Sequence, residues 1–354
     1  MDEQNKNSRS CCSKEDKTAS RKKPWYSRFL FWVLMFNILC LSLAAIFPQL
    51  ISFRISFFNY LKIMALPVFL GLILGGLVDR FVPKQYVIQL LSSHQKRTVF
   101  YASALGFLMS ACSHGILALS MELHKKGASG PAVISFLLAS PWANLPITFL
   151  LVGFFGGRGF LIILAALFVS FSTGLALQVL DRKGWIEKNK NQIPAQADFS
   201  IRKDLARRMK HYRFSLPLML QDIQGITKGI FALADMMMSW VLIGMILASA
   251  ASAFIPGEIF HKFLGPSVLG LLATLGLATI LEVCSEGTAP LAFEIYRQTG
   301  ALGNTFVFLM GGVVTDITEV GLVWHNLGKK TAFWMLVISI PQVFIVGYIF
   351  NSLF

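Results

Sequence analysis

The chain has 354 residues, of which 55% are hydrophobic and only 14% are charged, and its mean hydropathy is +0.62. Soluble domains carry about 25% charged residues, so this composition places most of the chain in a lipid bilayer. The formal net charge of +14 would suggest nucleic-acid binding in a soluble protein. Here the basic residues gather in the N-terminal tail and in loops between apolar runs, a distribution typical of membrane topology, and we expect no nucleic-acid partner.

The N-terminal part divides into a tail and a first apolar run. Residues 1–28 are polar and mixed in charge, which predicts a disordered cytoplasmic tail. The vicinal thiols Cys11 and Cys12 in this tail are either incidental or a capture point for a soft metal or metalloid. The run 29–51 is long enough to cross a bilayer and too long for a signal-peptide core, so we expect a retained first transmembrane helix.

The remaining apolar runs form two groups on either side of a basic loop at 181–228, which we expect to be cytoplasmic. They lie at 61–82, 98–121, 131–155, 159–180, 230–255, 268–292, 303–324 and 332–353. The sequence therefore predicts an all-α polytopic membrane protein, with one membrane repeat at 60–180 and a second at 229–354. Residues 217–235 mix apolar and polar side chains, which is consistent with an amphipathic helix at the cytoplasmic surface.

The two groups repeat one another in sequence. Gly71 corresponds to Gly244 at an offset of 173 residues, within the similar segments GLIL and GMIL. The four residues from Cys112 correspond to those from Cys284 at an offset of 172, and Asn144 falls on Asp316 at the same offset. Matching Cys, Gly and acid positions over about a hundred residues predict two copies of one structural unit.

The distribution of Lys and Arg indicates how the repeats are oriented. If all nine runs cross the membrane, 16 of these cations lie on each side. If the cysteine-bearing runs 98–121 and 268–292 are instead broken or re-entrant, 27 lie inside and 5 outside. The positive-inside rule favours the second arrangement, in which each repeat crosses three times. We therefore expect inverted-topology repeats with the N-terminus in the cytoplasm.

Buried acids mark the candidate transport site. An acid at the middle of a membrane helix costs about 2.5–3.5 kcal/mol, so several acids in one apolar region predict a protein-lined or watery interior. The stretch from Glu282 to Glu319 carries five acids and several glycines. We expect substrate to contact the repeated motif and the acids that follow it, namely Cys112, Ser113, His114, Gly115, Asn144, Cys284, Ser285, Glu286, Gly287, Asp316 and Glu319.

The chemistry of the repeated motif favours a soft solute. Cys112 and Cys284, brought together by a pseudo-twofold axis, would supply two sulfur ligands, which prefer soft metals and metalloids. His114 and Glu286 hold the equivalent position and can titrate, as a proton-coupling pair would. Each residue also has a structural interpretation: the cysteines could fill apolar space and His114 could bond a free carbonyl. Asp316, like Asn144, could line the pathway or cap a helix end.

The same residues carry a resemblance to a known family. The segments EVCSEG, APLAFE, GALGN and DITEVG between Glu282 and Gly321, together with CSHG, KGAS and FLLASP in the first half, resemble a predicted-permease family. This family includes the bacterial organoarsenical efflux permeases. The resemblance covers residues 60–354 and implies a multi-pass permease of the bacterial inner membrane. For some members it implies efflux of trivalent organoarsenicals.

Three functions follow from these observations. The first is a secondary transporter that exports a soft, thiol-reactive solute by proton exchange. The second is a permease for another small anion or sulfur species, bound by half-helix ends. The third, an intramembrane enzyme, is disfavoured because the sequence has no G-x-S-x-G or H-E-x-x-H motif. We therefore expect a transporter rather than an enzyme, with no cofactor or bound metal, a small-molecule substrate and the lipid bilayer as its surroundings.

Overall fold

The computed structural model describes residues 29–81, 97–106, 113–125, 127–143, 145–189, 216–281 and 285–354. Every regular element in this part of the chain is helical. The first half comprises α1 (Phe29–Ile46), the short 3₁₀ helix η2 (Pro48–Leu50), α2 (Ile51–Phe81), α4 (Arg97–Gly106), α5 (Ser113–Lys125), α6 (Gly130–Ala143), α7 (Leu145–Phe155) and α8 (Gly157–Arg182). The second half comprises α10 (Leu216–Phe254), α11 (Gly257–Leu264), α12 (Val268–Ile280), α13 (Ser285–Thr299), α14 (Leu302–Thr315), α15 (Ile317–Asn326) and α16 (Lys329–Leu353).

The length and composition of these helices fit a membrane protein. Six helical stretches in the described part are long and apolar enough to cross a bilayer, and the number rises to eight if two bent helix pairs each form one span. The bent pairs are α6 with α7, at 47°, and α11 with α12, at 102°. The prediction of an all-α polytopic membrane protein is therefore confirmed.

Two helix boundaries differ in detail from the apolar runs. The first run, 29–51, contains the end of α1 at Ile46 and the start of α2 at Ile51. Helix α10 begins at Leu216, so the last part of the basic segment 181–228 is already helical. Pro217 lies in the first turn of α10, where proline needs no backbone hydrogen-bond donor and is well tolerated.

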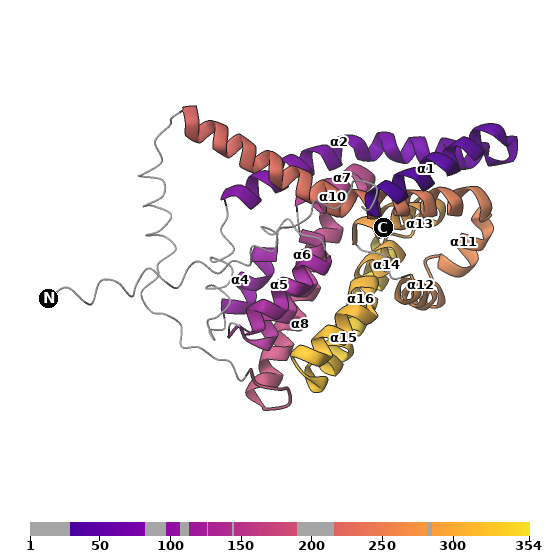
Figure 1. Cartoon of the computed structure of the whole chain (residues 1–354). Helices are drawn as coiled ribbons and strands as arrows, with labels where there is room; N and C mark the ends of the chain where they lie inside the picture. The colour runs from indigo at the N-terminus through magenta and orange to yellow at the C-terminus, as the bar shows by residue number, and fades with distance from the viewer. Residues whose placement is uncertain are drawn as a thin grey trace.

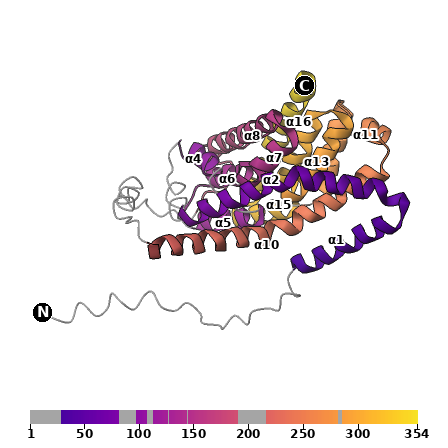
Figure 2. The same ribbon diagram turned by 90° about the horizontal axis from the view of Figure 1, so that it is seen from above.

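Helices α2 and α10 form an antiparallel pair, here called the α2–α10 arm. Figure 1 shows the two helices side by side along one edge of the molecule, and Figure 2 shows the same pair from above with α1 beside it. At one end of the arm the Ser56 and Ser252 hydroxyl oxygens are 2.9 Å apart. At the other end Arg80 Nη2 lies 2.8 Å from Asp222 Oδ1. These two contacts fix the register of the pair.

The remaining helices form two bodies, one from each half of the chain. In the first body α6 packs against α4, α5 and α8, and in the second α14 packs against α12, α13 and α16. Helices α6 and α14 are buried along almost their whole length because other helices surround them, and Phe136 and Phe306 are completely buried there. The bodies meet where α8 packs against α16, and they also cross over, with α7 against α13 and α5 against α15.

The helix bounds of the second body follow those of the first at the 172-residue offset found in the sequence. Helix α5 begins at Ser113 and α13 at Ser285, and α14 has the bounds of α6 shifted by the same offset. Gly156 precedes α8 with φ of 58°, and Gly328 precedes α16 with φ of 119°. Glycine adopts these positive φ values without the steric cost that other residues incur.

The loop after α8 ties the two bodies together through Glu187. Its carboxylate oxygens accept hydrogen bonds from the backbone N–H groups of Lys330 and Thr331, both at 3.0 Å, and from the Thr331 hydroxyl at 2.9 Å. Burial raises the pKa of Glu187, but these hydrogen bonds lower it more, so its pKa lies below the ordinary value. Glu187 therefore caps the N-terminus of α16 as a carboxylate.

Candidate functional site

Asp316 lies at a break in a membrane span. Residues 302–326 are long and apolar enough to cross a bilayer as one segment, yet α14 ends at Thr315 and α15 begins at Ile317. Asp316 Oδ1 accepts hydrogen bonds from the backbone N–H groups of Thr318 at 2.7 Å and Glu319 at 3.0 Å. The sequence left two roles open for Asp316, lining the pathway or capping a helix end, and the structure shows that it caps α15. A role in lining the pathway stays a prediction.

Glu319 follows Asp316 on the first turn of α15 and is deeply buried. Its side chain is 4% exposed, and its Oε2 atom has no hydrogen-bond partner among the residues that the structure describes. A carboxylate buried in this way is costly in a membrane span, so Glu319 is suited to carry a proton or to meet a bound solute.

The second copy of the repeated motif forms the first turn of α13. Ser285, Glu286 and Gly287 are all buried, and Ser285 Oγ lies 3.2 Å from Glu286 Oε2 as a hydrogen-bond donor. Gly244 of α10 packs so closely on this turn that a Cβ placed on Gly244 would overlap the Gly287 carbonyl oxygen. The start of α13 is therefore held against the α2–α10 arm.

The structure describes only part of the candidate site. Cys112, Asn144 and Cys284 lie outside the described residues. Ser113, His114 and Gly115 form the first turn of α5, whose backbone is described, and α5 packs against α15, the helix that carries Glu319. The motif on α13 lies instead against α10, where Gly287 meets Gly244. A meeting of the two cysteines stays a prediction.

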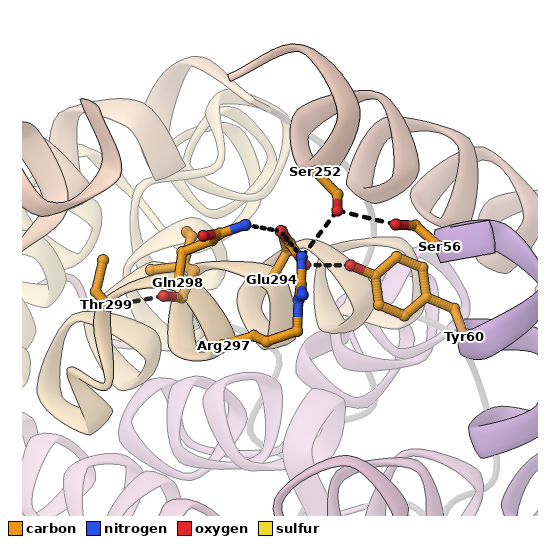
Figure 3. Close-up of polar contacts among 8 residues, drawn as sticks. Ser56, Tyr60, Ser252, Glu294, Arg297, Gln298 and Thr299 are labelled. Carbon is orange, nitrogen blue, oxygen red and sulfur yellow. Dashed lines mark hydrogen bonds and ion pairs between the residues drawn. The ribbon is translucent and has the colours of Figure 1, made fainter. Parts of the chain in front are cut away.

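A polar cluster that the sequence did not predict joins α13 to the arm (Figure 3). At its centre Glu294 is completely buried and accepts a hydrogen bond from the Tyr60 hydroxyl. Arg297 donates to both carboxylate oxygens of Glu294, each at 2.7 Å, and Gln298 Nε2 donates at 2.7 Å. Arg297 Nη2 also donates to Ser252 Oγ at 2.8 Å. The cluster thus connects α13 to both helices of the arm.

A pocket of about 350 Å³ opens in front of this cluster. It is lined by polar and cationic side chains beside two apolar ones, namely Ser56, Asn59, Tyr60, Lys62, Ile63, Phe293 and Arg297. The ring of Phe293 stacks on Phe154 of α7 at 4.6 Å between centroids and meets Tyr60 edge-on. A larger cavity of about 620 Å³ between α10, α11, α12 and α13 is lined only by apolar side chains, so it offers no polar recognition.

Comparison with known proteins identifies the family. The sequence matches the family described as "Predicted permease" (ArsP_1) over residues 52–352, which is most of the chain. The chain belongs to this family. It is similar to the UPF0718 protein YcgR of Bacillus subtilis, with 25% identity over 296 residues that cover 82% of this chain and 94% of the relative. It is also similar to the UPF0718 protein MJ0584 of Methanocaldococcus jannaschii, with 23% identity and coverage of 85% and 94%.

A further relative is named as part of a complex. A protein of Streptococcus mutans, named as a candidate subunit of a two-component membrane permease complex, is 23% identical over 85% of this chain and 95% of its own length. No solved structure matches the chain closely enough to count as a relative. The family and this relative are named as permeases, so the permease resembles membrane transporters rather than enzymes.

Proposed function

We propose that this permease is a secondary transporter that exports a small, soft, thiol-reactive solute such as a trivalent organoarsenical. The observation that carries the proposal is the position of two helix starts. Helix α5 begins at Ser113 and α13 at Ser285, so each half-helix starts one residue after a cysteine of the repeated motif. Thiolates at these positions would be stabilised by the positive ends of the helix dipoles and would favour a soft solute.

We further propose that the two halves are inverted-topology repeats in a bacterial inner membrane, with the N-terminus in the cytoplasm. The common helix bounds at the 172-residue offset support two copies of one unit. The excess of Lys and Arg on one side, 27 against 5, supports opposite orientations of these copies. Transporters of this kind bind solute near the membrane midplane, between discontinuous helices.

Proton exchange is the proposed source of energy. Glu286 is completely buried at the start of α13, and Glu319 is buried at the start of α15. A carboxyl group that gains a proton in one state and loses it in the other couples the proton gradient to the movement of solute. His114 is a third candidate for this role because it occupies the position in α5 that Glu286 occupies in α13.

Uptake of methylarsenite by everted membrane vesicles tests the proposal. The intact permease should accumulate trivalent methylarsenite, and the double variant Cys112→Ser/Cys284→Ser should lose this activity while still inserting in the membrane. Cys40→Ser is the matched control, because Cys40 lies on α1 and has no counterpart in the repeat. An intact permease that takes up no methylarsenite would contradict the arsenical assignment.

A permease for another small anion is the second candidate. The observation that favours it is the pair of cations, Lys62 and Arg297, at the pocket of about 350 Å³. Anions are also stabilised at helix N-termini, such as the buried start of α13. Uptake that persists in the double cysteine variant would support this candidate, because it does not require the thiols.

A further inference from the structure

We propose that Tyr60, Glu294 and Arg297 form the outer gate of the permease, and that the pocket in front of them is the mouth through which the solute leaves. The word outer rests on the proposed topology, which places the C-terminal end of α13 on the outer side. The gate itself requires only that the chain transports something, and it does not depend on the cysteines or on an arsenical substrate.

The first observation is an asymmetry in how the α2–α10 arm packs. Helix α2 packs against α7, and α10 packs against α13. At the 172-residue offset α13 corresponds to α5, and α15 corresponds to α7. In the described part of the chain neither helix of the arm packs extensively against α5 or α15. The arm therefore closes the end of the bundle that contains α7 and α13, and among the described residues it does not cover the equivalent opposite end.

Individual residues show the same asymmetry. Gly71 and Gly244 are equivalent in sequence, and neither could carry a Cβ without overlap. Yet Gly71 meets Pro146 of α7, whereas Gly244 meets Gly287 of α13. The equivalent residues Glu294 and Glu122 also differ in burial, since Glu294 is completely buried and Glu122 is exposed. In the part of the chain that the structure describes, the arm thus meets the two equivalent ends of the bundle differently.

The hydrogen bonds of the cluster suit a contact that opens and closes. Only two of them cross from α13 to the arm, namely Tyr60 to Glu294 and Arg297 to Ser252. The bonds from Arg297 and Gln298 to Glu294 lie within α13 and would survive separation. Opening therefore leaves the Glu294 carboxylate with its counter-charge. Opening thus breaks two hydrogen bonds but leaves the ion pair of Glu294 and Arg297 intact, so no charge stays buried without a counter-charge.

The pocket fits the role of a mouth. Tyr60 and Arg297 belong both to the cluster and to the pocket lining, so separation of the arm from α13 would extend the pocket inwards. Following α13 inwards from this point leads to Thr288 and then to the buried motif at Ser285. The gate thus lies between the pocket and the second copy of the motif.

Labelling of a buried cysteine tests the gate. Thr288→Cys would be introduced into a chain whose five native cysteines are replaced by serine, because Thr288 is 5% exposed and lies behind the cluster. A membrane-impermeant maleimide would be added to right-side-out and to everted vesicles. Tyr60→Phe should raise the rate of labelling from outside about tenfold, the shift expected from loss of one hydrogen bond to a charged group. Glu294→Gln should raise it by a smaller factor, because the Gln amide oxygen can still accept a hydrogen bond from Tyr60 but without the charge that strengthens it.

The control is Tyr296→Phe, which removes a phenol at the same end of α13. The Tyr296 hydroxyl accepts a hydrogen bond from Arg158 and not from the arm, so this variant should leave the labelling rate unchanged. Unchanged labelling in both Tyr60→Phe and Glu294→Gln would overturn the proposal and make the cluster a static link. An increase only in everted vesicles would also overturn it, because the gate would then face the cytoplasm. The assay contains no arsenical, so its failure is distinguishable from failure of the proposed function.

Discussion

Removal of the Arg297 charge should destabilise the permease more than removal of the Glu294 and Arg297 charges together. Glu294 is completely buried and accepts four hydrogen bonds, two of which come from Arg297. In Arg297→Met the carboxylate would stay buried with Tyr60 and Gln298 but without a counter-charge. Breaking a buried ion pair in this way costs about 3–5 kcal/mol. Because the Arg297 side chain is 48% exposed, water can partly replace it, and we expect about 3 kcal/mol.

The double variant Glu294→Gln/Arg297→Met removes both charges and should lose only about 1 kcal/mol, since the neutral amide of Gln can still accept a hydrogen bond from Tyr60. At about 2 °C per kcal/mol, Arg297→Met should lower the unfolding temperature by about 6 °C and the double variant by about 2 °C. Tryptophan fluorescence of the protein in lipid nanodiscs measures both. A double variant that unfolds below Arg297→Met would refute the reasoning, because the two losses would then add.

Three further predictions test individual positions. Gly244→Ala should cost at least about 2 kcal/mol of stability because its Cβ would overlap the Gly287 carbonyl, whereas Gly276→Ala, with open space around its Cα, should be neutral or slightly stabilising in a thermal melt. Asp316→Ala should lose about 1 kcal/mol of cap energy and Asp316→Asn very little, so a transport defect in Asp316→Asn would reveal a role beyond capping. The lowered pKa of Glu187 stabilises the fold above the unfolded pKa of about 4.5, and this contribution is lost as the pH falls through the folded pKa. The unfolding temperature should therefore fall less steeply below about pH 5 in Glu187→Gln than in the intact protein, and equal slopes would contradict the cap.

The sequence predicted the parts of this fold that depend on local composition. Runs of apolar residues were enough to place the spans, because a bilayer requires helices of a minimum length. The repeated Cys-Ser-x-Gly motif suggested a helix start in each half, and α5 and α13 begin at Ser113 and Ser285. That the two are half-helices of a transport site stays a prediction. Asp316 was recognised as a special position from its charge in an apolar region, and the structure adds its hydrogen bonds to the backbone of α15.

The polar cluster could not be predicted because its members are far apart in the sequence. Tyr60 and Glu294 are separated by 234 positions, and Tyr60 in an apolar run resembles any aromatic residue at a membrane interface. Glu294 was not among the expected site residues, and the structure shows that it is completely buried. The spacing of Glu294 and Arg297, three residues apart on one helix face, was the available signal. The contact that Tyr60 of α2 makes with Glu294 of α13 could be found only from the structure.

The two halves of the permease share helix bounds but not surroundings, and this difference bears on the direction of transport. In the present structure Gly244 meets Gly287 of α13. The equivalent residues in the first repeat are Gly71 and Gly115, which are also both glycines. If the arm moved to the opposite end of the bundle, these two glycines could therefore meet in the same way. A polar seal like that of Tyr60 would not form there, because the equivalent residue of α10 is Leu233, whose side chain has no donor. Under the proposed topology the state closed on the outer side therefore has the additional hydrogen bond. A resting permease closed to the outside and open to the cytoplasm is the arrangement that loads a solute for export.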